Sequence, residues 1–298
     1  MIDPEILRQV RRIQVRTSRL VTDVMAGGYN SVFRGSGIEF DEVREYSEGD
    51  DPRTVDWNVT ARTGRPHVKK FVEERELTVL FLLDLSASMR AGFVRRSARD
   101  AAAELCACLA LSAIRNNDKV GLIAFTDRIE RYVPAKKGIG HVLRIVRDCL
   151  AHEPAGTQTN MTAALEFAGR VVRRKSILFL VSDFQTGSED EKTLRIVSRR
   201  HDVIAARLLF PEAQILTNTR NRGLIHFRDY ETGRELVRDF SSAAVRAAFA
   251  NNLEQWRKKV DDRFRRARID VMDVPVELPV VDPILKFFRK RESRAAHG

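Results

Sequence analysis

From Leu77 onward, short apolar runs alternate with segments in which apolar residues recur at helical spacing. The apolar runs occupy residues 77–84, 119–125, 176–183, 202–209 and 268–274. Helices are predicted between them over residues 95–114, 139–150, 161–172 and 241–266, and a hairpin is predicted around residues 231–233. Strands that are apolar on both faces are typical of parallel sheets buried between helices. The pattern therefore predicts a doubly wound α/β fold with a mostly parallel sheet.

The chain before Leu77 has a different character. An amphipathic helix is predicted from Asp3-Pro4 to about Met25, with proline at its first position and glycines after its end. Residues 35–76 are rich in turn residues and contain short alternating pieces, which indicates strands and ordered loops. We divide the chain into an N-terminal helix and loop segment (1–76), an α/β domain (77–274) and a basic C-terminal tail (275–298).

The tail allows two interpretations. Its apolar residues Ile284, Leu285, Phe287 and Phe288 lie beside basic ones, as in helices that bind a membrane surface. The alternative, which we favour, is that these side chains dock on the body of the protein.

Composition narrows the choice of compartment and partner. The net charge is +11 and the pI is near 9.9, which permits binding to nucleic acid, an anionic membrane or an acidic protein. Basic and acidic residues are interleaved, so a mixed-charge solvated surface is the simpler interpretation. The three cysteines lie among apolar residues and are predicted to be small core side chains. With no signal-peptide pattern and no transmembrane segment in the sequence, we expect a cytoplasmic protein.

Polar oxygen-bearing residues follow the ends of two apolar runs. Asp84 and Asp183 end their runs, Ser86 and Ser88 come directly after the first, and Thr159 precedes a predicted helix. Ligand sites of doubly wound sheets lie outside the carboxyl ends of the strands. Two carboxylates and three hydroxyls there form a ligand set suited to Mg²⁺ or Mn²⁺. Each residue alone could equally be a turn or cap residue, but their combination favours a metal site.

The order Asp-x-Ser-x-Ser, then a distant Thr, then a distant Asp resembles the metal-ion-dependent adhesion site (MIDAS) of von Willebrand factor type A (VWA) domains. The resemblance implies that Asp84, Ser86, Ser88, Thr159 and Asp183 hold the ion, and that a partner's carboxylate fills an open position on it. One departure is that Phe184-Gln185 follows the last aspartate, where glycine is more usual.

Residues 28–274 also resemble the bacterial domain of unknown function 58 (DUF58) family, most specifically in the stretch "GDDPRTVDW" followed by "AR". That resemblance implies a partner, a MoxR-type AAA+ ATPase, and a chaperone-like or cofactor-insertion role. The charged turn could be a docking surface for the ATPase, or its paired charges could brace a loop around a large aromatic side chain. Its residues are Arg44, Asp50, Asp51, Arg53, Asp56, Trp57 and Arg62.

Three function classes compete. We expect a non-enzymatic, Mg²⁺-dependent protein-interaction module that binds the ATPase and an acidic protein client. A phosphohydrolase of the haloacid dehalogenase type would also place an aspartate at a strand end, but Ser86 stands where its second acid is needed. Nucleic-acid binding fits the pI, but no basic run interleaved with aromatics supports it. There is no Walker loop, no Gly-x-Gly-x-x-Gly and no Cys/His zinc spacing in the sequence.

Overall fold

A computed structural model of the chain describes residues 4–20, 28–29, 32–33, 42–47, 50, 52, 55–70, 76–91, 96–185, 191–211, 215–216 and 223–296. Its centre is a six-stranded sheet with the order β10-β7-β6-β3-β4-β5. The strands are β3 (Thr78–Asp84), β4 (Lys119–Phe125), β5 (Ile129–Lys136), β6 (Ile177–Ser182), β7 (Asp202–Leu209) and β10 (Asp270–Pro275). All neighbouring strands are parallel except β5, which runs antiparallel to β4. The predicted doubly wound, mostly parallel sheet is confirmed.

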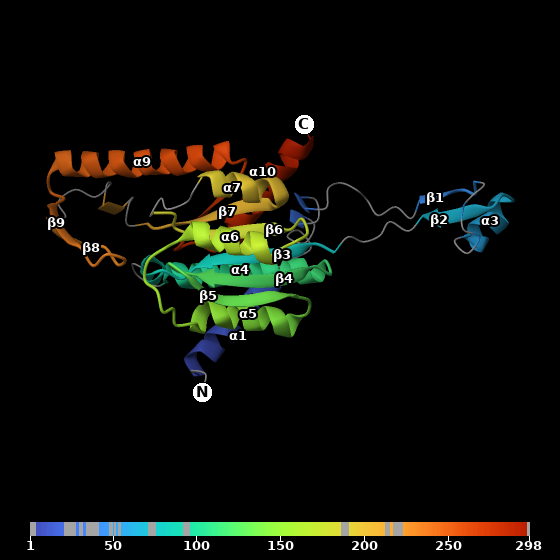
Figure 1. Ribbon diagram of the computed structural model, residues 1–298, viewed down its shortest axis with the longest axis horizontal. Coiled ribbons are helices and arrows are strands. Elements are labelled where there is room, and N and C mark those ends of the chain that lie inside the picture. The colour runs from blue at the N-terminus through green and yellow to red at the C-terminus, as the bar shows by residue number, and fades with distance from the viewer. Residues whose placement is uncertain are drawn as a thin grey trace.

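Helices cover both faces of this sheet (Figure 1). One face packs against α4 (Ala98–Arg115) and α5 (Ile139–Ala151), and the other against α6 (Met161–Val171), α7 (Glu191–Arg200) and α9 (Ala243–Arg266). Successive residues of β3 point to opposite faces, so Phe81 belongs to one core and Leu80 and Leu82 to the other. This explains why the strand is apolar at every position from Val79 to Leu83.

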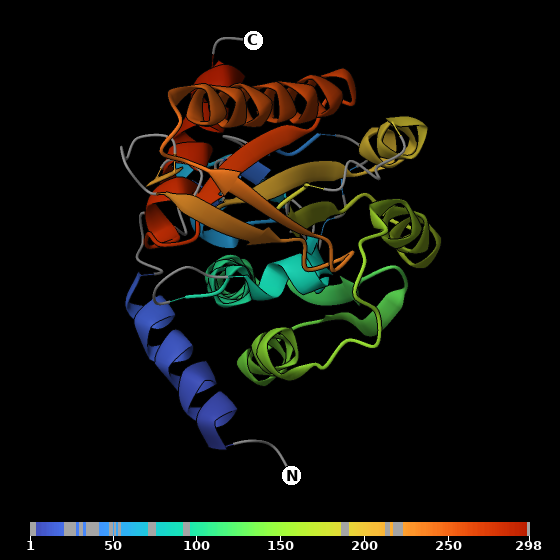
Figure 2. The same cartoon turned by 90° about the vertical axis from the view of Figure 1, so that its left-hand side faces the viewer.

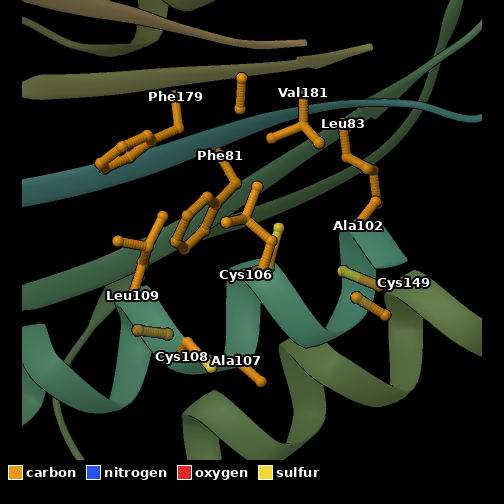
Figure 3. Packing of buried hydrophobic residues seen from close by; sticks show 14 of the residues in the cluster. Phe81, Leu83, Ala102, Cys106, Ala107, Cys108, Leu109, Cys149, Phe179 and Val181 are labelled. Atoms are coloured by element: carbon orange, nitrogen blue, oxygen red, sulfur yellow. The ribbon is translucent and has the colours of Figure 1, made fainter. Parts of the chain in front are cut away.

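Helix α4 can approach the sheet closely because its buried residues are mostly small. Ser97 caps the helix in a reciprocal capping box with Asp100. Figure 3 shows Cys106 facing Phe81 and Ala102 facing Leu83. The rings of Phe81 and Phe179 stack with centroids 5.6 Å apart. The three cysteines are buried, as predicted, and none of them forms a disulfide. Burial raises the pKa of the Cys106 thiol well above its usual range.

Segments from both ends of the chain complete the first core. Helix α1 (Pro4–Leu20) contributes Val10 and Ile13, and α10 (Val281–Ala296) contributes Ile284 and Phe288. Phe288 is 1% exposed, so the prediction that the tail docks on the body is confirmed. The predicted divisions at residues 76 and 274 thus separate segments that share one core.

The signature segment forms a small unit of its own. Strands β1 (Glu42–Glu45) and β2 (His67–Lys70) pair antiparallel, and α3 (Trp57–Thr63) lies beside them. Figure 1 shows this unit away from the six-stranded sheet. Strands were expected here, but the helix was not. Asp56 begins α3 by accepting from the backbone of Asn58 and Val59, and Gly64 ends it in the left-handed conformation at φ 71°.

The bracing role predicted for Trp57 is wrong. Its side chain is 73% exposed, so it is not enclosed by charged residues. Arg44 and Asp50 do form an ion pair, at 2.6 Å. Arg62 is an exposed residue in the last turn of α3. Asp51 and Arg53 lie outside the described residues.

The remaining predictions agree with the structure within a few residues. The helix expected from Arg95 begins at Ala98, and the predicted hairpin is formed by β8 (Leu224–Arg228) and β9 (Glu235–Asp239). Ser188 and Glu191 have the spacing of a capping box, which predicts the helix found as α7, but Ser188 itself falls outside the described residues. Within the described ranges, no helix combines the length and apolarity that crossing a membrane requires.

Candidate functional site

Two neighbouring parallel strands end side by side and bring together the two predicted carboxylates. Asp84 is the last residue of β3, and Asp183 follows the last residue of β6. Ser182 Oγ donates to Asp84 Oδ2 at 2.7 Å, which ties the two strand ends together. Asp84 is 0% exposed and Asp183 is 2% exposed. The site is thus built into the rim of the sheet.

The two serines follow Asp84 in a tight turn. The backbone N–H of Ser86 donates to Asp84 Oδ1 at 2.8 Å, and the short helix η2 (Ala87–Arg90) begins directly after it. Ser86 Oγ lies 3.1 Å from Ser88 Oγ. The Ser88 hydroxyl is also close enough to Asp183 to lower the pKa of that carboxyl. Both hydroxyls therefore face the carboxylates.

Thr159 reaches the same place from a different loop. Its Oγ1 lies 3.4 Å from Asp84 Oδ2. The loop is fixed to the first turn by Ala87 N–H donating to Thr157 O at 2.9 Å. Asn160 N–H donates to Thr126 O at 2.9 Å, and the Asn160 side chain caps α6. All five predicted ligands are brought together by these contacts.

Glu130, which was not predicted from the sequence, lies on β5 and holds this loop. Its carboxylate accepts from Ala155 N–H at 3.0 Å, Gly156 N–H at 2.8 Å and Thr126 Oγ1 at 2.6 Å. Burial raises the pKa of Glu130, but these hydrogen bonds outweigh burial, so the pKa is lowered overall. Glu130 is therefore an ionised anchor that positions the Thr159 loop.

Electrostatics at the rim favour a bound cation. Burial, and then the charge of Asp183, raise the pKa of Asp84 to about 7. Burial also raises the pKa of Asp183. Among the described residues, neither carboxylate has an ion pair with lysine or arginine, and Asp183 Oδ2 is buried without a hydrogen-bond partner. Buried charges in proteins are normally paired or coordinate metals.

The residues present fit a hard divalent cation. In the described part of the chain, no three Asp, Glu, His or Cys side chains are arranged to hold a metal by themselves. The candidate set instead combines two carboxylates with three hydroxyl groups, which are oxygen ligands of the kind Mg²⁺ accepts.

Phe184 follows the last aspartate of the site, where glycine is more usual in MIDAS motifs, and its backbone has a conformation that glycine favours. Its φ is 55°, in the left-handed region that glycine adopts more easily. Helix α9 holds it there, because Trp256 Nε1 donates to Phe184 O at 3.1 Å. Phe264 also packs its ring edge-on against Phe184, with centroids 5.0 Å apart. Packing against α9 thus replaces the conformational freedom of glycine.

One further acidic residue at the site, Glu231, was not predicted from the sequence. Thr159 Oγ1 donates to Glu231 Oε1 at 2.8 Å, and Glu231 lies in the turn between β8 and β9. The sequence marked this residue only as part of a hairpin turn, and its distance along the chain from Thr159 gave no signal of contact.

The profile of the family described as "Protein of unknown function DUF58" matches residues 42–259. The uncharacterised protein Mb1516 of Mycobacterium bovis is 28% identical over 299 aligned residues, covering 99% of this chain and 93% of the relative.

Among solved structures, the conserved hypothetical protein BatB from Bacteroides thetaiotaomicron aligns with a TM-score of 0.45 and 17% identity, covering 74% of this chain and all of BatB. The VWA domain of SpRpn10 aligns with a TM-score of 0.40 and 13% identity, covering 70% of this chain and 94% of that domain. These scores are low, so the fold of the chain is established by its own sheet order.

Proposed function

This chain belongs to the DUF58 family, and from that premise we propose that it is a non-enzymatic protein-interaction module that depends on a divalent cation. The five residues at the rim of the sheet would hold Mg²⁺ or Mn²⁺. One observation carries the proposal: two buried carboxylates converge there with no basic partner among the described residues, and one oxygen of Asp183 is unpartnered. When bound, the cation would supply a Lewis-acidic position for a carboxylate of another protein.

Within this proposal, the protein works with a MoxR-type AAA+ ATPase and an acidic protein client in a chaperone-like or complex-maturation step. The net charge of +11 supports the choice of acidic partners, because opposite charge accelerates encounter. The exposed indole of Trp57 is a second candidate contact, since aromatic residues are enriched in protein interfaces.

The arrangement gives less support to a phosphohydrolase. Such an enzyme needs a general acid two residues after the nucleophilic aspartate. Here Ser86 holds that place, and its hydroxyl lies against Ser88. No other residue on η2 carries a carboxyl group.

Calorimetric titration of chelator-treated protein with Mg²⁺ or Mn²⁺ tests the cation site. Wild type is expected to bind, and Asp84→Asn is expected to remove binding because one charged ligand is lost. Glu235→Gln, on the exposed strand β9, is a charge-matched control that should bind like wild type. Equal binding by Asp84→Asn and wild type would reject the site.

Surface plasmon resonance with the purified ATPase tests the partner. Chelation or Asp183→Asn should abolish stable association, whereas added salt should mainly slow the association rate, because salt screens long-range attraction but not a direct ligand bond. Association that is indifferent to both the cation and Asp183 would leave Trp57 and its charged neighbours as the better candidate contact.

A further inference from the structure

Glu231 differs from every residue around it in its exposure. All the other residues from Arg228 to Asp239 are exposed, and Glu231 alone is partly buried. Figure 2 looks onto the end of the sheet where β8 and β9 lie, and shows the hairpin crossing in front of it. Between residues 228 and 239, the hairpin therefore directs only the acidic side chain of Glu231 into the molecule.

The turn that carries Glu231 is well defined. Asp229 Oδ1 accepts from the backbone N–H of Glu231 at 2.9 Å and of Thr232 at 3.3 Å. Gly233 N–H donates to Asp229 O at 2.8 Å, with Gly233 in the left-handed conformation at φ 69°. These bonds fix the backbone of the turn and so the direction in which the Glu231 side chain leaves it.

The hairpin is anchored to α9 by aromatic packing. Phe227 of β8 contacts Phe240 and Phe249, with ring centroids 5.5 and 5.9 Å away. Arg246 of α9 donates to Phe240 O at 2.6 Å and to Ser241 O at 2.7 Å. Because α9 also holds Phe184 beside Asp183, one helix supports both the hairpin and a strand end of the candidate site.

At the site, Glu231 contacts two of the five candidate ligands. It accepts from Thr159 Oγ1 at 2.8 Å, and the Ser86 hydroxyl is close enough to influence its carboxyl. The negative charges of Glu231 and Asp183 repel each other. A dication between the two carboxylates would attract both of them and outweigh this repulsion.

We infer that Glu231 is an internal carboxylate ligand, which in the cation-loaded protein takes the position that a partner's carboxylate would need. The inference rests on the proposed cation site. Its consequence is that the β8–β9 hairpin blocks the site from within the same chain. An acidic partner then binds only by displacing Glu231, so the hairpin sets how easily the site opens.

Two measurements with Mg²⁺ as the probe test this role on the full chain. In calorimetry, Glu231→Gln should weaken Mg²⁺ binding at least as much as the roughly 10-fold to 100-fold loss seen when a residue that merely orients a ligand is removed. In hydrogen exchange, Mg²⁺ should slow the exchange of amides in residues 224–239 of wild type, and this slowing should be absent from Glu231→Gln. Glu231→Asp keeps the charge but shortens the side chain, so it should lose most of the same effect.

Glu235→Gln is the matched control, because it removes an acid from the same hairpin at an exposed position. It should retain both Mg²⁺ affinity and Mg²⁺-dependent protection. The inference is overturned if Glu231→Gln binds Mg²⁺ like wild type, or if Mg²⁺ leaves exchange of the wild-type hairpin unchanged. In either case the proposed function stands as long as Asp84→Asn removes binding. Absence of binding to wild type would overturn both.

Discussion

Asp84 is fully buried, and its burial, followed by the charge of Asp183, raises its pKa from 3.8 to about 7. Between these values the folded protein keeps a proton on Asp84 that the unfolded chain releases. Because only the folded state holds this proton in that pH range, the free energy of unfolding falls as pH rises from about 4 to about 7, and it levels off above pH 7. At roughly 1.4 kcal/mol per pH unit, the loss is at most about 4 kcal/mol.

We therefore predict that chelator-treated Asp84→Asn gains stability relative to wild type as pH rises from about 4 to 7, because the amide carries no charge to bury. Urea unfolding free energies measured across this range for both proteins check the prediction. Taking the difference between the two proteins removes the contributions of other carboxyls, such as Glu76, whose pKa is shifted in the opposite direction. Parallel pH profiles would show that Asp84 is not the residue responsible.

The sequence predicted the five candidate ligands but not Glu130 or Glu231. Asp84 and Asp183 could be found because each ends an apolar strand, and parallel strands end at the same edge. Glu130 and Glu231 reach the site through long-range contacts of loops. Their partners Gly156 and Thr159 are 26 and 72 positions away along the chain, and no local pattern records such contacts.

The loop before α6 is a structural element on which Thr159 depends, and Gly156 is its tightest point. A Cβ atom at Gly156 would lie 1.9 Å from Asp127 Oδ1 and 2.3 Å from Thr126 Oγ1. We predict that Gly156→Ala displaces the loop and weakens Mg²⁺ binding, because Thr159 moves away from Asp84. Calorimetric titration of the variant checks this.

Gly169→Ala is the control for that variant. Gly169 lies in α6, directly after the same loop, and an added Cβ meets nothing within 4 Å. Alanine should leave Mg²⁺ binding unchanged and stabilise the helix by up to about 1 kcal/mol. Equal Mg²⁺ affinity in the two variants would mean that the loop does not position a ligand.

Helix α3 shows why the element structure of the signature segment was harder to predict than the sheet. It has only seven residues, and Val59, Thr60 and Thr63 are β-branched, which favours strands. The signals present were an aspartate before it and a glycine after it, at Asp56 and Gly64. The sheet strands were easier to recognise because burial on both faces makes them continuously apolar.

Trp57 on this helix is exposed, so truncating it should cost much less stability than truncating a buried aromatic side chain. We predict that Trp57→Ala changes the free energy of unfolding by less than about 0.5 kcal/mol, as exposed substitutions usually do. If the signature segment docks a partner, the same variant should weaken association with the ATPase. Thermal unfolding and surface plasmon resonance separate the two effects. A large drop in melting temperature would mean that the indole packs against another part of the protein.

Segments from both ends of the chain meet on one side of the sheet and complete the core on that face. Phe288 of α10 lies edge-on to Phe33, with centroids 5.8 Å apart, and Tyr29 packs 6.4 Å from it. Tyr29 also donates to the buried Asp118 at 2.9 Å, which links this cluster to the start of β4. The apolar spacing of the tail predicted a helix that docks, but it did not identify aromatic residues near the other terminus as its partners.

Because Phe288 joins these segments, we predict that Phe288→Ala lowers the free energy of unfolding by about 3–5 kcal/mol, the usual range for a buried phenylalanine. Part of this loss comes from the cavity left against Tyr29 and Phe33. That cavity lies on the face of the sheet opposite α9. Leu278→Ala is the control: its side chain is 55% exposed, so it should change stability little. Urea unfolding of both variants, with Mg²⁺ titration of Phe288→Ala below its unfolding transition, tests whether the tail stabilises the body without shaping the rim. Equal stability of the two variants would mean that the tail is not part of the core. Loss of Mg²⁺ binding by a folded Phe288→Ala variant would mean that the two faces of the sheet are coupled through the strands that carry Asp84 and Asp183.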